Sequence, residues 1–382
     1  MIIKLIFILS LNLLLANQLD LYDLQIIATT NNNGEIEPCG WKKKPLGGLA
    51  RKATLIDEIN LDDNSIIVDA GNLLFKDNSI SKGVSYDISK ITSEIIINSF
   101  NEIGCHAFSP GVKDFSLGLD VVREMELLAD FPFISANIKD TAGNLLFEPY
   151  TIEEVNGIKI AIIGLSSKFN STEVIIDDPI TALSNVVDEI ASQVNFTLLL
   201  FSAIQSDINL LNNESMPIDF IIRSNSTIKS RDGGTEAIPM YSIGDKGKNI
   251  FKFIVSINDL NLKNFVDIPR YDNIIDRNQK QLDKLKEGNL VSDLYEIYKD
   301  DDITLNKINT YERLMNDANA KISESVNTIK FTKYELDKKV IGKTEILEIV
   351  DYGKGLIEQI TGPPMPDSQG RPPGHPHHGH NH

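Results

Sequence analysis

Five histidines close to the carboxyl end of the chain are the residues whose type and spacing most plainly suit metal binding. They are interleaved with Pro, Gly and Asn, and they are His375, His377, His378, His380 and His382. Neutral imidazoles this close together bind Zn, Ni or Cu. Three interpretations stay open for this tail: natural metal handling, an inert hydrophilic end, or a purification tag. The interrupting residues argue against a simple tag.

A second group of polar residues is organised as five short motifs, most of which follow apolar runs. Loops at the ends of strands are where layered α/β folds place their chemistry, so these motifs are candidates for one site. The motifs are TTNNNG at residues 29–34 with EP at 37–38 and GGLAR at 47–51, DAGN at 69–72, GVKDFS at 111–116, SA at 202–203, and IDFIIRSNST at 218–227.

In their order and spacing, these motifs resemble those of the calcineurin-type metallophosphoesterases, in the 5'-nucleotidase group. The resemblance covers about residues 22–258. It implies an α/β fold, a four-layer α/β/β/α sandwich, with two metal ions at its site. In that family the metals generate a hydroxide nucleophile and neutralise the phosphoryl group.

The resemblance also shows which positions would hold the metals, and this chain departs from the family at each of them. The positions matching the family's metal ligands, together with its catalytic histidine at residue 113, are Asn31, Asn33, Asn72, Val112, Lys113, Ala203, Asn225 and Thr227. Val and Ala have no donor atom, and Asn offers only one neutral oxygen. Asn72, at the bridging position, brings no negative charge. We therefore expect no metal cofactor in the core and no catalytic residue.

Three cations near these motifs prompt a different hypothesis. Lys113 and Arg223, with Arg51, could bind an anion such as phosphate without cleaving it. The alternative is that the side chains of Lys113 and Arg223 reach solvent or pair with a local acid such as Asp114, since charged side chains are mostly exposed.

These observations predict a non-catalytic, exported pseudo-phosphoesterase that acts as a binding or scaffold protein, with an unknown protein or a small anion as its partner. One alternative is a 5'-nucleotidase-like phosphohydrolase with an atypical metal site, and another is metal handling through the tail. The net charge of −17 argues against nucleic acid as a partner, because phosphate contacts need clustered Lys and Arg.

The first residues predict export. Lys4 precedes an apolar run at residues 5–15, and Ala16 follows as a small residue for cleavage, so residues 1–16 are typical of a signal peptide. The run is shorter than the ~20 apolar residues of a membrane span, and no later segment is apolar enough to be one. We expect a secreted or periplasmic protein. That compartment would permit a disulfide between Cys39 and Cys105, although the sequence leaves their separation open.

Alternating apolar runs and amphipathic stretches divide the rest of the chain. We predict three parts after the signal peptide. The metallophosphoesterase-like domain covers residues 18–262, a mostly helical cap covers residues 270–361, and a disordered Pro-, Gly- and His-rich tail covers residues 362–382. Within the domain, Asn156-Gly157 predicts a β-hairpin. The apolar stretch at residues 131–136 predicts a strand.

Overall fold

The computed structural model describes residues 22–40, 43–60, 64–214, 216–234, 238–262, 264–286 and 293–362. The predicted signal peptide at residues 1–16 and the five tail histidines lie outside the described residues. Within the described part, no helix is both long enough and apolar enough to span a bilayer.

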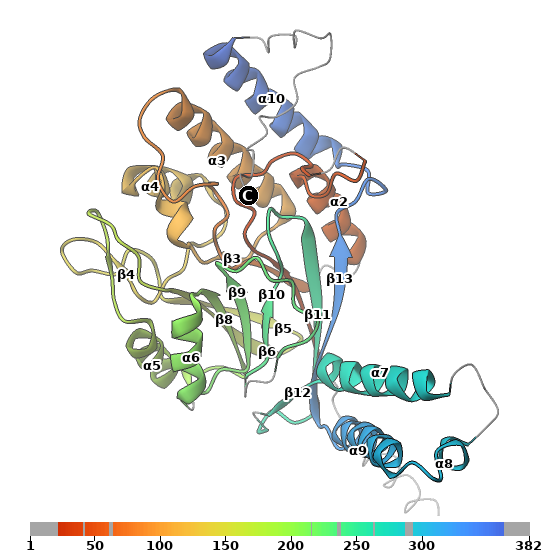
Figure 1. Ribbon diagram of the computed structural model, residues 1–382. Coiled ribbons are helices and arrows are strands. Elements are labelled where there is room, and N and C mark those ends of the chain that lie inside the picture. Colours follow the sequence, from red (N-terminus) through yellow and green to blue (C-terminus); the bar gives the residue numbers. More distant parts are fainter. Residues whose placement is uncertain are drawn as a thin grey trace, which may run out of the picture.

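Two sheets form the centre of the molecule (Figure 1). The first has six strands in the order β12-β13-β11-β1-β2-β3, and the second has five in the order β10-β9-β8-β6-β5. The strands of the first sheet are β1 (Tyr22–Thr29), β2 (Ser65–Asp69), β3 (Ala107–Phe108), β11 (Asn249–Ile257), β12 (Phe265–Asp267) and β13 (Asn327–Glu335). Those of the second are β5 (Tyr150–Val155), β6 (Ile158–Ser166), β8 (Phe196–Ser202), β9 (Phe220–Ser224) and β10 (Met240–Ser242), while β4 (Ile138–Lys139) and β7 (Ile175–Ile176) pair with each other.

Helices cover the outer face of each sheet, so that the fold has the four layers α/β/β/α that the sequence predicts. On the first sheet lie α2 (Leu49–Ile59), α3 (Val84–Ile103), α4 (Leu119–Leu128) and α10 (Thr344–Thr361), and on the second lie α5 (Pro179–Ile190) and α6 (Gln205–Asn213). A short 3₁₀ helix, η1 (Val112–Phe115), precedes α4.

The alternation of side chains along the strands explains this layering. In β1, Leu24 and Ile26 pack between the two sheets, whereas Ile27 packs against the helices. In β8, Leu198 and Leu199 divide in the same way. Both faces of these strands are therefore covered, which is why they read as continuous apolar runs.

The predicted hairpin is confirmed, and the predicted strand at residues 131–136 is wrong. β5 and β6 pair antiparallel around Asn156 and Gly157, which have φ values of 53° and 77°. This left-handed pair is the geometry of a tight hairpin turn. In residues 131–136, Phe133 and Ile134 form only single bridges, to Phe108 and Glu148 respectively. Their side chains fill the core while the backbone passes between partners without forming a ladder.

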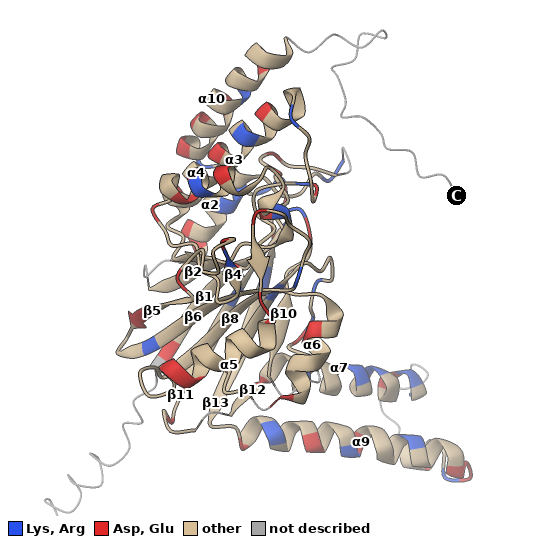
Figure 2. Ribbon diagram, turned by 90° about the vertical axis from the view of Figure 1, so that its left-hand side faces the viewer, with Lys and Arg blue, Asp and Glu red and all other residues tan. Residues whose placement is uncertain are grey.

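The carboxyl-terminal region is more closely joined to the sheets than a helical cap would be. Strand β13 lies inside the first sheet, between β11 and β12. The helices α7 (Ile268–Leu285), α8 (Leu294–Ile297) and α9 (Asp302–Ser323) connect β12 to β13. Figures 1 and 2 show α7 and α9 extending side by side away from the sheets. Helix α10 instead packs on α3, where Gly353 leaves room for Ile95.

Candidate functional site

The predicted site residues meet where the strands end. Asn31 and Asn33 follow β1, Asn72 follows β2, and Asn225 follows β9. Strands β1 and β2 are parallel, as are β8 and β9, so the loops after each pair share one edge. Lys113 reaches the same place from η1. The fold therefore gathers these five positions, which are far apart in the sequence.

Asn31 is the centre of a network of side-chain amides. Its Nδ2 group donates to the carbonyl oxygens of Gly244, at 2.9 Å, and Ser226, at 3.0 Å. Its Oδ1 atom accepts from the backbone N–H of Asn225 at 3.0 Å and from Nδ2 of Asn72 at 3.3 Å. The side chain is 4% exposed. Both ends of this buried amide are therefore satisfied by protein groups, as buried polar groups require.

Asn33 joins a cation and a carboxylate to this network. Lys113 Nζ donates to Asn33 Oδ1 at 3.0 Å, and Asn33 Nδ2 donates to Asp245 Oδ1 at 2.6 Å. The backbone N–H of Lys113 donates to Oδ1 of Asn72 at 3.2 Å. We refer to Asn31, Asn33 and Asn72 as the amide network.

The backbone supplies a second reason for asparagine at these positions. Asn31, Asn33, Asn72 and Asn225 all have positive φ, with values of 48°, 53°, 54° and 57°. Among residues with a Cβ atom, Asn and Asp adopt this left-handed region most readily. At residues 31 and 72, where the family resemblance places aspartate, asparagine therefore keeps the loop conformation while removing the charge.

Asp114 holds the loops that carry the network. It is fully buried and accepts four backbone N–H groups at 2.7–2.8 Å, from Asn72, Leu73, Leu74 and Gly111. Burial raises its pKa to about 6, and the four donated hydrogen bonds oppose that rise. Lys113 does not pair with it, so Asp114 has a structural role and leaves the lysine free to reach Asn33.

A second buried acid and a buried lysine lie beneath the network. Asp69 Oδ2 accepts from Thr29 Oγ1 at 2.6 Å, and Oδ1 accepts from the N–H of Gly71 at 2.8 Å. Burial raises the pKa of Asp69 to about 7, with Lys52 acting against the rise. Lys52 Nζ donates to Asn32 Oδ1 at 3.0 Å, and burial lowers its pKa to about 8.

The side chains at three of the predicted metal-ligand positions take no part in the amide network. Ala203 is buried in the core between the second sheet and its helices. Thr227 is exposed, and Val112 is half-buried with only an apolar side chain. The family's ligand set is thus incomplete on the side formed by β8, β9 and η1.

The residues present do not fit a two-metal centre. In the part of the chain that the structure describes, no group of three or more His, Cys, Asp or Glu could hold a metal ion. The side-chain oxygens of Asn31, Asn33 and Asn72 each accept at least one hydrogen bond already. The ammonium group of Lys113 adds positive charge where a dication would need the opposite.

Arg51, Lys113 and Arg223, the residues of the hypothesised anion site, have different hydrogen-bond partners in the structure. Arg51 donates to the carbonyl of Pro45 at 3.1 Å. Arg223 donates to the carbonyl of Ala203 and to Gln205 Oε1, at 3.1 and 2.9 Å. Alternation along β9 places Arg223 on the same face as Ile221, which packs under α5 and α6. Among the residues that the structure describes, the three cations therefore share no hydrogen-bond partner.

The disulfide that the sequence left open is not formed in this structure, where Cys39 and Cys105 are both free thiols. Cys39 pairs with Leu46 in the loop after the end of β1, whereas Cys105 precedes the start of β3. Strands β1, β2 and β3 are parallel, so these two positions lie at opposite ends of the sheet. Burial raises the pKa of both thiols.

Sequence reasoning did not identify three of the residues at this site. Asp245 lies in the loop that follows β10, between Gly244 and Gly247. In the sequence, only these glycines mark the loop. Ser202 and Ser224 end β8 and β9 as register partners, and their hydroxyl groups are buried without a hydrogen-bond partner in the described part of the chain. A Cβ atom at position 111 would lie 2.5 Å from Ser202 Oγ and 2.8 Å from Asn72 Oδ1, so only glycine fits there.

Comparisons with known proteins agree with this fold. No protein-family model matches the chain. A 5'-nucleotidase of Vibrio cholerae is 35% identical over 151 residues, which are 38% of this chain and 26% of that protein. The UshA protein of Escherichia coli is 30% identical over 150 residues, again 38% of this chain and 26% of that protein. The match thus spans about a quarter of the length of these relatives.

Solved structures extend the similarity over more of the chain. A 5'-nucleotidase precursor from Thermus thermophilus aligns with a TM-score of 0.61 and 16% identity, covering 89% of this chain and 60% of that one. The calcineurin-like phosphoesterase YfkN from Bacillus subtilis aligns with a TM-score of 0.59 and 18% identity, covering 89% of this chain and 99% of that one. At these identities the likeness concerns the fold.

Proposed function

We propose that this chain, which has the fold of calcineurin-like phosphoesterases and matches part of the 5'-nucleotidases in sequence, is a metal-free, non-hydrolysing member of that family that acts by binding. The observation that carries the proposal is the amide network. Asn31, Asn33 and Asn72 bond to one another and to Lys113 at the positions where the family resemblance puts metal ligands. Hydrolysis in that family depends on a metal-generated hydroxide.

The site has lost negative charge at both positions where the family resemblance places a carboxylate ligand, and this supports the proposal. Removing metals while keeping their carboxylates would leave buried, unpaired negative charge, which is strongly destabilising. Here Asn31 and Asn72 are neutral, and Lys113 contacts an amide oxygen. The buried acids Asp69 and Asp114 are retained only where backbone or hydroxyl groups bond to them.

A working phosphohydrolase is the second candidate, and a specific observation favours it. The Vibrio cholerae relative at 35% identity is itself named a 5'-nucleotidase. In this case a metal would have to bind through ligands other than those of the family. Export of the protein to the periplasm or the medium is part of both proposals, and the signal-like residues 1–16 and the Thermus thermophilus precursor support it.

Elemental analysis of the purified chain, together with hydrolysis of a generic phosphate ester in the presence of Mn²⁺ or Zn²⁺, tests these alternatives. A variant with Asn in place of the five tail histidines is measured beside it. The proposal predicts no core metal and no turnover in either protein. Metal that disappears in the tail variant would support the third candidate, metal handling by the tail.

Two tightly bound metals in the tail variant, or turnover that a chelator abolishes, would make the protein an enzyme with a relocated site. A triple substitution Asn31→Asp, Asn33→His and Asn72→Asp provides a matched comparison. If metal binding appears only in the triple variant, the amide network is what excludes metal from the native chain.

A further inference from the structure

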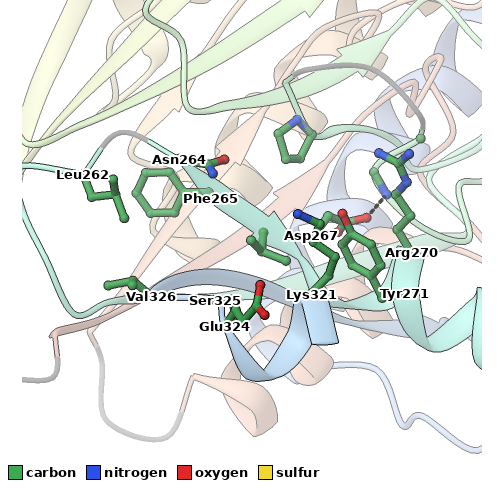
Figure 3. A pocket seen from close by; sticks show the side chains of 14 residues that line it. Leu262, Asn264, Phe265, Asp267, Arg270, Tyr271, Lys321, Glu324, Ser325 and Val326 are labelled. Carbon is green, nitrogen blue, oxygen red and sulfur yellow. Dashed lines mark hydrogen bonds between the residues drawn. The ribbon is translucent and has the colours of Figure 1, made fainter. Parts of the chain in front are cut away.

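A cavity of about 420 Å³ lies where the two sheets meet the α7–α9 hairpin (Figure 3). The edge strands β10 and β12 flank it, and the first turn of α7 and the end of α9 complete its walls. Strand β12 pairs with the start of β13, and β13 runs parallel to β1. The cavity therefore lies at the opposite end of the sheet from the amide network, which follows the end of β1.

One buried acid fixes the shape of this cavity. Asp267, 6% exposed, accepts from the hydroxyl of Tyr241 at 2.6 Å and from the N–H of Gly233 at 2.7 Å. These bonds tie β12 to β10 and to the loop before it. Because both carboxylate oxygens already accept hydrogen bonds, Asp267 is a structural wall of the cavity and not a free charge within it.

The remaining lining combines apolar surface with two cations. Phe265 and Tyr271 provide aromatic walls, and Val326 at the mouth is 40% exposed. Arg270 lies 5.8 Å from the centre of the Tyr271 ring, and Lys321 lines the cavity from α9. Within the described residues, neither cation forms an ion pair or a side-chain hydrogen bond.

The charge around the cavity favours an anionic ligand. A carboxylate, Glu324, also lies on the rim, but it is exposed and bonds to neither cation. A second cavity of about 820 Å³ continues from Arg270 along α7. Besides Arg270, its charged lining residues are Arg231, Arg277, Lys280 and Lys284 together with Asp232, Asp276 and Asp283. Figure 2 shows the resulting blue bands along α7. Cations outnumber carboxylates in the lining of this second cavity, whereas the whole chain has a net charge of −17.

We propose that the cavity binds a small organic anion, in which an aromatic or branched apolar body carries one carboxylate, sulfonate or phosphate group. The body packs against Phe265, Tyr271 and Val326, and the anionic group lies between Arg270 and Lys321. The volume lies within the roughly 300–1,000 Å³ of small-molecule sites, which combine apolar walls with a few placed polar groups. This site does not depend on the state of the amide network.

Fluorescence titration of the full chain with 1-anilinonaphthalene-8-sulfonate, an aromatic anion, tests the proposal. The dye binds, and phenyl phosphate displaces it, whereas inorganic phosphate and phenol each displace it about tenfold less well, since each lacks one of the two groups. The double variant Arg270→Gln/Lys321→Gln binds the dye about tenfold more weakly, the size of a lost charge-assisted hydrogen bond.

The matched control removes the same charge from α9 outside both cavities, by Lys307→Gln/Arg313→Gln, and leaves dye binding unchanged. Circular dichroism confirms that both double variants fold. Equal dye affinity in the Arg270→Gln/Lys321→Gln variant would overturn the proposal, as would equal displacement by inorganic phosphate and phenyl phosphate. Stronger displacement of the dye by a ten-residue Glu peptide than by phenyl phosphate would also overturn it, because the cavity would then bind an acidic protein segment.

Discussion

The substitution Asn31→Asp restores the carboxylate that the family resemblance places at residue 31, and we expect it to destabilise the fold. Asparagine and aspartate have the same shape and both tolerate the φ of 48° found here. The substitution therefore changes the charge and the hydrogen-bonding pattern with little effect on the backbone. One carboxylate oxygen can still accept from Asn225 and Asn72.

The cost arises at the other end of the side chain. Nδ2 of Asn31 donates to the carbonyls of Gly244 and Ser226, and in the variant these would face a carboxylate oxygen. Each buried acceptor left without its donor costs about 1–3 kcal/mol, and an unpaired buried charge costs about 3–5 kcal/mol. Because these effects overlap, we expect a loss of about 3–5 kcal/mol near neutral pH.

Urea unfolding followed by circular dichroism measures this loss. The control is Asn156→Asp in the exposed β5–β6 turn, where φ is 53° and the expected change is within about 0.5 kcal/mol. Burial would raise the pKa of the introduced carboxyl group in the folded state. Its cost should therefore be small below pH ~4 and grow as the pH rises.

Two results would refute this reasoning. The first is an unfolding midpoint for Asn31→Asp equal to that of the native chain at pH 7. The second is a rise in the native chain's midpoint when Mn²⁺ is added, because ligand binding to the folded state stabilises it. Either result would mean that the amide network does not exclude charge from this position.

Three further predictions concern the buried groups around the network. Asp114→Asn leaves two of the four bonded N–H groups without an acceptor and should lower the free energy of unfolding by about 3 kcal/mol, measured in urea. Ser224→Ala removes a buried hydroxyl without a partner and should raise the thermal midpoint or leave it unchanged, whereas Ser109→Ala, which removes a bonded hydroxyl, should lower it. The pKa of Asp69 is raised from 3.8 to about 7, so its contribution to stability should be lost as the pH rises between these values. Asp69→Asn should reduce the fall of the urea midpoint across that window and abolish it between about pH 6 and 7, because Asp114, with its pKa raised to about 6, still titrates below pH 6. Lys52, with its pKa lowered to about 8, acts only at higher pH.

Much of the fold could be predicted because the relevant signals are local. The hairpin at Asn156-Gly157 follows from turn chemistry within a few residues. The segment at residues 131–136 has the same apolar character as a strand. Its neighbours Phe108 and Glu148 come from distant parts of the chain, so the lack of a ladder could not be predicted locally.

The amide network was only partly predictable for the same reason. The motifs identify Asn31, Asn33, Asn72 and Lys113 as altered positions in the sequence. Their mutual hydrogen bonds depend on the register of β1 and β2 and on the loop held by Asp114. Asp245 could not be recognised beforehand, because a polar residue in a glycine-flanked loop is common.

Residue identity by itself determined what the candidate site lacks. Val112 and Ala203 have no donor atom in any fold, and asparagine has no negative charge at physiological pH. Tertiary structure alone decided what the remaining groups do, because hydrogen bonds and ion pairs require contact between residues far apart in the chain. It gave Arg51, Arg223 and Lys113 different hydrogen-bond partners, left Cys39 and Cys105 unbridged, and brought Arg270 and Lys321 to the walls of one cavity.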